Sequence, residues 1–166
     1  MPSSAPPHLA ALTCTKRTRH GFSSLSQGHR YAGWLDWCRE GYWATPGGSL
    51  EAGEDHAAAA ALRELSEELG VDEKDVVLGT QLAERSTDHA VGGREVRQVE
   101  RYFLAQLAPT DVDLARATQP DNIQAHRWWS LQELRDTPET IYPVGLLDLI
   151  TEVLAKGVPE RPIVLR

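Results

Sequence analysis

Cysteine is scarce in this chain, and long apolar runs are absent. The 166 residues include two cysteines, Cys14 and Cys38, which are too few for a disulfide framework and lack metal-ligand spacing. We therefore expect both to be reduced thiols and the protein to be cytoplasmic. No apolar run approaches the ~18 residues that a membrane-spanning helix needs, so we expect no membrane partner. Residues 1–7 lack the apolar centre of a signal peptide.

Positive charge is also in deficit. The 17 Lys and Arg residues stand against 24 Asp and Glu, for a net charge of −7. A nucleic-acid-binding surface is normally basic, so the composition argues against nucleic acid as a partner. A small polyanion stays compatible if a metal ion supplies local positive charge. The length suits one globular domain that buries about 70% of its unfolded surface, and a homodimer is left open.

Residues 47–71 read as a glycine-rich loop followed by one helix. Asp55 is the expected N-cap, a run of alanines follows, and Gly70 stands where a C-terminal cap belongs. An apolar stripe at helical spacing predicts the buried side of the helix: Ala58, Leu62, Leu65 and Leu69.

Three carboxylates share another side of that predicted helix. Glu64, Glu67 and Glu68 are three and four residues apart, and such like-charged pairs cost roughly 0.2–0.5 kcal/mol each. A hard divalent ion such as Mg²⁺ or Mn²⁺, which prefers oxygen ligands, would relieve the repulsion. The alternative is a solvated face in which Arg63 pairs with Glu67. The adjacent glycines favour the ion site, because they let a carbonyl or phosphate approach closely.

This stretch resembles the Nudix box, G-x5-E-x7-R-E-U-x-E-E-x-G-U, in which U is aliphatic. The matching residues are Gly48, Glu54, Arg63-Glu64-Leu65, Glu67-Glu68 and Gly70-Val71. One spacing departs from the pattern, because eight residues rather than seven separate Glu54 from Arg63. An extra residue inside a helix would rotate it by about 100°. We expect the helix to keep its Arg63–Glu68 register, with the extra residue taken up around Asp55 to Ala58.

The resemblance implies a Nudix-type α/β/α sandwich with a mixed central sheet. It also implies metal-dependent hydrolysis of a nucleoside diphosphate linked to another moiety, with a small-molecule nucleotide as substrate. By the same resemblance, the carbonyl of Gly48 and the carboxylates of Glu64, Glu67 and Glu68 would hold Mg²⁺ or Mn²⁺. Glu67 or Glu68 would act as base, and Arg63 would fix the loop by pairing with Glu54.

The segments around the box are less regular. Residues 1–40 look divergent, although Leu9 to Thr15 could form a strand of the same sheet. Residues 41–157 carry the Nudix-like pattern. Residues 158–166 look like a peripheral tail. A strand from Val76 to Glu84 and a longer one from Glu95 to Leu107 should flank an extended loop, Arg85 to Gly93.

Three residues outside the box are weaker candidates for the site. Gln98 and Glu100 should share one face of the second strand with Tyr102 and Leu104. They could supply a metal ligand, a base or a substrate contact, or simply form the wet face of an edge strand. Beyond a polar loop over the site, Asp111 to Asn122, we expect a short strand, His126–Trp129. Alternation there would turn only one of Trp128 and Trp129 toward a base, with Trp128 as the candidate, and the other would pack in the core.

Two other functions remain open. The extra residue before Arg63 and the unusual first 40 residues are compatible with a catalytically impaired Nudix domain that senses or regulates by binding a nucleotide. Isomerisation of an isoprenoid diphosphate would require a cysteine near the site. Phosphate-containing products formed with Mg²⁺ and absent with a chelator would separate hydrolysis from binding.

Overall fold

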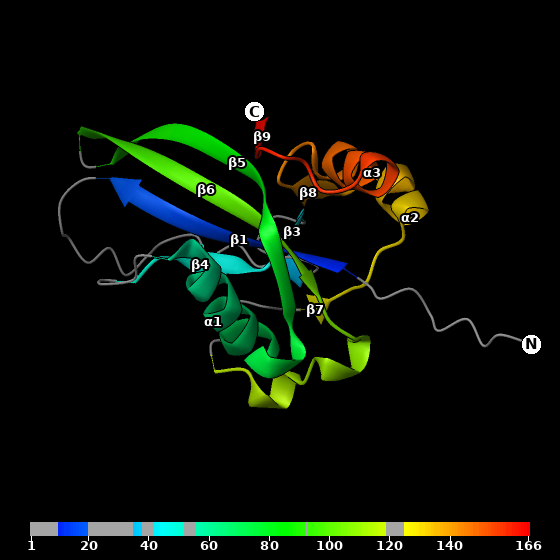
Figure 1. Cartoon of the computed structure of the whole chain (residues 1–166). Helices are drawn as coiled ribbons and strands as arrows, with labels where there is room; N and C mark the ends of the chain where they lie inside the picture. The colour runs from blue at the N-terminus through cyan, green and yellow to red at the C-terminus, as the bar shows by residue number, and fades with distance from the viewer. Residues whose placement is uncertain (1–9, 20–34, 38–41, 52–55, 92, 119–124) are drawn as a thin grey trace, which may run out of the picture.

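Two β-sheets and three α-helices form the part of the chain that the computed structural model describes, residues 10–19, 35–37, 42–51, 56–91, 93–118 and 125–166 (Figure 1). The larger sheet has the order β4-β1-β6-β5-β9. Strand β1 runs parallel to β4 and antiparallel to β6, so the sheet is mixed. Its strands are β1 (Ala10–Arg19), β4 (Gly47–Ser49), β5 (Val77–Val91), β6 (Arg94–Gln106) and β9 (Ile163–Leu165).

The smaller sheet has the order β7-β2-β3-β8. Strand β3 is parallel to β8 and antiparallel to β2, and it leads directly into the glycine-rich loop. The strands are β2 (Leu35–Trp37), β3 (Tyr42–Ala44), β7 (Ala125–His126) and β8 (Thr140–Tyr142).

Helices cover both faces of the larger sheet. Helix α1 (Ala57–Leu69) packs Leu65 and Leu69 against Ala105 and Leu107 of the β6 region. On the other face, α3 (Leu146–Lys156) packs Leu146 and Leu149 against a cluster that includes Tyr102, with the short α2 (Leu131–Asp136) beside it (Figure 1). The expected α/β/α sandwich with a mixed central sheet is therefore confirmed.

Strand β6 places its side chains alternately on the two faces. Ala105 belongs to the cluster under α1, whereas Tyr102 and Leu104 belong to the cluster under α3. Burying a leucine such as Leu65, which is fully shielded from solvent, contributes roughly 1.5–3 kcal/mol. The expected alternation along this strand is confirmed, and it fixes which polar residues share a face.

The hairpin of β5 and β6 is longer than the sequence indicated. The expected loop from Arg85 to Gly93 is wrong, because β5 stays paired with β6 as far as Val91. Gly93, at φ 79°, lies in the tight turn. The exposed ion pair of Asp88 and Arg97, whose atoms are 2.8 and 3.0 Å apart, joins the strands near that turn. Cross-strand pairs of this kind favour a paired ladder over a loop.

The ends of the chain contribute to the large sheet. Strand β1, from the segment with the weakest sequence pattern, lies between β4 and β6. The tail is not peripheral, because β9 pairs in parallel with β5. Near α2, the strand expected over His126–Trp129 ends at His126, and α2 begins with a capping box formed by Ser130 and Glu133. Of the described helices, none has the length and apolar character needed to cross a membrane.

Helix α1 begins and ends at well-defined residues. Its N-cap is His56 rather than the expected Asp55, which lies outside the described residues. Gly70 adopts the left-handed conformation, as expected for a C-cap. The polar segment after β6, expected as a loop over the site, folds into the 3-10 turns η2 (Pro109–Asp111) and η3 (Leu114–Arg116). The backbone N–H of Asp113 donates to the carbonyl of Leu69 at 3.0 Å, so this segment caps the end of α1.

Gly70 is therefore predicted to tolerate no side chain. A Cβ there would lie 1.9 Å from the carbonyl oxygen of Asp113, in addition to the strain of φ +64°. Gly145 is the matched control, because it is also left-handed but would place a Cβ no closer than 4.0 Å to its neighbours. We expect Gly145→Ala to lower the free energy of unfolding by about 1–2 kcal/mol and Gly70→Ala to lower it substantially more. Equal losses in urea titrations would contradict this account of the α1 C-terminus.

Candidate active site

A very close approach joins α1 to strand β4. An ideal Cβ on Gly48 would lie 2.1 Å from Oε1 of Glu64 and 2.5 Å from its Oε2. Only glycine leaves room for the carboxylate at this position, because no side chain of any size fits such a gap. The predicted orientation of Glu64 toward the glycine loop is confirmed.

Glu64 and Glu68 are both buried, one turn apart on α1. They are 6% and 3% exposed, respectively. Oε2 of Glu68 accepts a hydrogen bond from the backbone N–H of Gly47 at 3.1 Å. A buried carboxylate is costly unless it is hydrogen-bonded or paired, so these two residues are not the solvated face that the charge pattern also allowed.

Arg63 joins the carboxylates to the loop. Its Nη1 lies 2.8 Å from Oε2 of Glu67 and 3.0 Å from Oε1 of Glu64, and its Nη2 donates to the carbonyl of Ser49 at 3.0 Å. The guanidinium thus offsets the like-charge repulsion along α1. Both sequence interpretations hold in part, since the i,i+4 pair of Arg63 and Glu67 exists beside two buried carboxylates. The expected partner Glu54 lies outside the described residues.

The extra residue in the box does not disturb α1. The helix is continuous from Ala57 to Leu69 without a π-bulge. Arg63, Glu64 and Glu68 keep the register in which both buried carboxylates face the glycine loop. The expected register from Arg63 to Glu68 is therefore kept, whereas residues 52–55 of the box lie outside the described residues.

The donors at this site suit a hard cation. Across the described residues, no three or more His, Cys, Asp or Glu side chains are already arranged as a metal-binding group. Arg63 instead bridges two of the carboxylates. Even so, α1 and β4 supply only oxygen donors, and the missing Cβ of Gly48 leaves a cradle directly over a buried carboxylate. Oxygen donors of this type are those that Mg²⁺ and Mn²⁺ prefer.

Glu100 lies on the other side of the large sheet, in a network of its own. It shares a face with Tyr102, away from α1, and is 2% exposed. Its oxygens accept hydrogen bonds from Nε of Arg85 at 2.8 Å, Nε2 of Gln98 at 2.7 Å and the hydroxyl of Tyr102 at 2.6 Å. The structure therefore brings Gln98 and Glu100 together but does not place them on the α1 face with Glu64. Sequence reasoning missed Arg85, which became visible only through the strand register.

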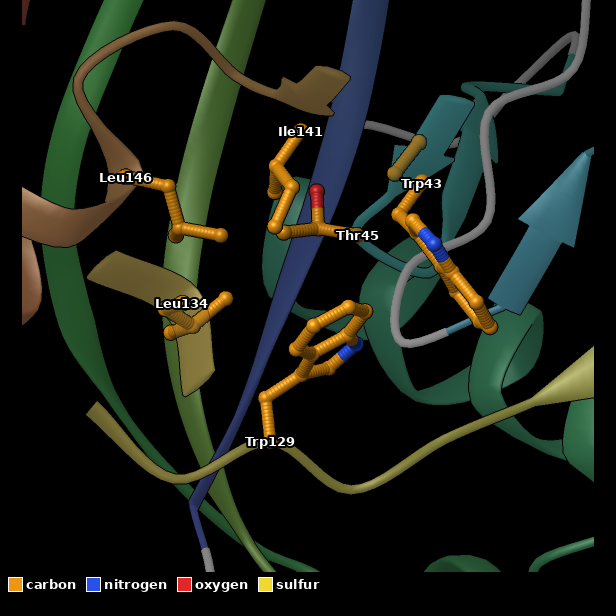
Figure 2. Close-up of a pocket in the computed structure, with 7 residues that line it drawn as sticks. Trp43, Thr45, Trp129, Leu134, Ile141 and Leu146 are labelled. Atoms are coloured by element: carbon orange, nitrogen blue, oxygen red, sulfur yellow. The ribbon is translucent and has the colours of Figure 1, made fainter. Parts of the chain in front are cut away.

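The two adjacent tryptophans separate as expected, but with Trp129 and not Trp128 at a pocket. Trp128 is half-buried against the apolar cluster under α1. Trp129 meets Trp43 edge to face, with ring centroids 5.2 Å apart, and Arg127 lies 4.0 Å from the Trp129 ring centroid. Figure 2 shows these rings beside a small apolar pocket whose lining comes from Trp43, Ala44, Thr45, Trp129, Leu134, Ile141 and Leu146. Strand alternation could not decide between the tryptophans, because neither lies in a strand.

Comparison with known proteins gives relatives that share one name. RNA pyrophosphohydrolase of Wolbachia pipientis is 32% identical over 57% of this chain and 62% of its own length. The RNA pyrophosphohydrolase of Rhodospirillum rubrum is 33% identical over 55% of this chain and 59% of its own length. That of Erythrobacter litoralis is 34% identical over 62% of this chain and 66% of its own length. The chain thus spans about three fifths of the length of the relatives it matches.

A family model covers a larger part of the chain than any of these relatives. The model for the NUDIX domain matches residues 12–147, which include most of β1, the box, α1 and α2, and end at the start of α3. The match begins well before Gly41, where the sequence pattern first becomes regular. Because it extends over far more than half of the 166 residues, this protein belongs to the NUDIX domain family.

Proposed function

We propose that this protein hydrolyses the pyrophosphate bond of a nucleoside diphosphate linked to another moiety. The observation that carries the proposal is the pair of buried carboxylates, Glu64 and Glu68, held against Gly47 and Gly48. Two buried acids on a glycine loop are expensive to maintain for stability alone. The names of the relatives, all pyrophosphohydrolases, support the same reaction.

Hydrolases of the Nudix family generally use divalent metals, and we assign Mg²⁺ or Mn²⁺ to this site. Glu64, Glu67 and Glu68, with the carbonyl of Gly48, would hold the ion. When bound, it would neutralise the diphosphate and lower the pKa of the attacking water.

The residues of the chain then perform three tasks. Arg63 sets the positions of Glu64 and Glu67 and ties them to the loop at Ser49. The N–H of Gly47 orients Glu68. Either Glu67 or Glu68 accepts the proton of the water that attacks phosphorus, while the phosphoanhydride bond breaks and the leaving phosphate departs.

The substrate has two candidate classes. The net charge of −7 favours a small nucleotide, whereas the names of the relatives point to RNA carrying a pyrophosphate. A substrate panel decides between the two classes by the rate at which each member is hydrolysed. It contains nucleoside triphosphates, sugar nucleotides, dinucleoside polyphosphates, oxidised nucleotides and 5′-diphosphorylated RNA. The measured product is released phosphate or nucleotide, with Mg²⁺ and with a chelator.

A nucleotide sensor without activity is the remaining alternative. Its main sequence argument was the extra residue before Arg63, and the regular helix from Ala57 to Leu69 removes that argument. Binding of a nucleotide without any Mg²⁺-dependent product would favour the sensor.

The carboxylates provide the first test. Glu67→Gln and Glu68→Gln keep side-chain size and remove one charge each, so we expect each change to reduce Mg²⁺-dependent hydrolysis by about a hundredfold or more. Glu152→Gln on α3, an exposed carboxylate remote from the site, is the matched control and should keep full activity. Added Mg²⁺ should raise the Tm of the parent more than that of either site variant. Turnover of both variants within about twofold of the parent would refute the assignment.

The glycine cradle provides the second test. Gly48→Ala would drive a Cβ into the Glu64 carboxylate, so we expect hydrolysis to fall as steeply as in Glu68→Gln while the protein remains folded. Gly79→Ala is the control, because its Cβ would meet the carbonyl of Leu104 at 3.2 Å, away from the α1 carboxylates. A Gly48→Ala enzyme with parental turnover would show that this approach is structural only.

A further inference from the structure

The positive charge of the chain is concentrated on one end of the large sheet. From the level of Gly48 onward, strands β1, β5 and β6 contain seven of the 17 Lys and Arg residues but only four of the 24 acids. The basic residues are Lys16, Arg17, Arg19, Arg85, Arg94, Arg97 and Arg101. This end is basic although the whole chain is acidic.

Strand register places four arginine positions on the same face as the carboxylate site. Ala105 packs under α1, so the alternation of β6 puts the positions of Arg101 and Arg97 on that face as well. Arg17 and Arg19 of β1 lie opposite Val99 and Arg97. We call the four positions Arg17, Arg19, Arg97 and Arg101 the basic sheet face.

The basic sheet face begins beside the glycine loop. Gly48 lies opposite Thr15, and Thr15 lies opposite Arg101. Because adjacent strands are about 4.8 Å apart, the Cα of Arg101 lies about 10 Å from the Cα of Gly48. The following arginine positions continue along β1 and β6 in steps of about 6.7 Å. In Figure 1 these strand ends extend past α1 and β4.

Of the two arginines that β6 contributes to this face, one is paired with a described acid and the other is not. Arg97 pairs with Asp88 and holds the pKa of that carboxyl below its usual value. Arg101 is only partly exposed, yet it makes no ion pair with any residue the structure describes, although Glu84 lies opposite it. In the strand register, the position of Arg19 lies opposite that of Arg97, which puts two basic positions side by side for an external anion.

We propose that the basic sheet face binds the phosphate backbone of a single-stranded nucleic acid whose 5′ diphosphate lies in the carboxylate site. This inference rests on the proposed function and names RNA as its substrate class. The described positions of the face carry no aromatic residue beyond Phe103, which is buried. The face therefore contacts phosphates without stacking bases and has no sequence preference.

The binding test needs no activity. The probe is a labelled single-stranded RNA of about ten nucleotides with a 5′ hydroxyl, titrated with the full chain in chelator at increasing salt. For the double variant Arg97→Gln/Arg101→Gln, we expect binding to weaken about tenfold or more. The slope of log K against log salt should flatten by about 1.4, because two phosphate contacts are lost.

The matched control removes the same charge elsewhere. Arg135→Gln/Lys156→Gln changes two exposed cations on α2 and α3 and should leave both affinity and salt slope at the parental values. Arg97 and Asp88 form an exposed ion pair, and exposed pairs contribute little to stability, so thermal melting should show both double variants folded. Absence of RNA binding by the parent, or an unchanged slope in the Arg97/Arg101 variant, overturns the proposal.

Kinetics separate this proposal from the proposed function. The Arg97/Arg101 variant should raise KM for 5′-diphosphorylated RNA while leaving kcat/KM for a nucleoside diphosphate unchanged. Equal losses on both substrates would place the arginines in the general phosphate site and contradict a separate face. If the parent hydrolyses no member of the substrate panel, the proposed function fails, and the titration with 5′-hydroxyl RNA still decides whether the face binds nucleic acid.

Discussion

The contact of α1 with strand β4 is the constraint on which the rest of the site depends. Glu64 lies where a Cβ of Gly48 would be, Glu68 accepts from the N–H of Gly47, and Arg63 donates to the carbonyl of Ser49. These contacts fix the rotation and height of the helix relative to the loop. Because two buried carboxylates tolerate little displacement without losing their partners, the helix and loop behave as one unit.

The large sheet separates two kinds of polar site. On the α1 face, the buried carboxylates of Glu64 and Glu68 meet the glycine loop. On the opposite face, Glu100 is enclosed by Arg85, Gln98 and Tyr102. Its burial and three donors give Glu100 the character of a structural anchor between β5 and β6, since charge-assisted hydrogen bonds are the strong ones. The buried acids on the two faces of the sheet thus occupy different environments.

Whole-chain charge was a poor guide to the surface. A net charge of −7 averages over carboxylates on helices and loops and over arginines that strand pairing collects at one end of the sheet. Screening in salt limits the range of each charge to about 8–10 Å. A ligand at that end therefore responds to the nearby arginines and hardly to the acids on the far helices.

The sequence by itself determined the helix that carries the site, because the spacing of Leu65 and Leu69, the carboxylate positions and Gly70 are properties of neighbouring residues. It also determined the alternation of β6. The Gly48–Glu64 approach, the partners of Glu100, the length of β5 and the pairing of β9 came only from the tertiary structure. The physical reason is that local periodicity decides which residues share a face of one element. Which elements then meet, and in what register, depends on packing between segments far apart in the chain.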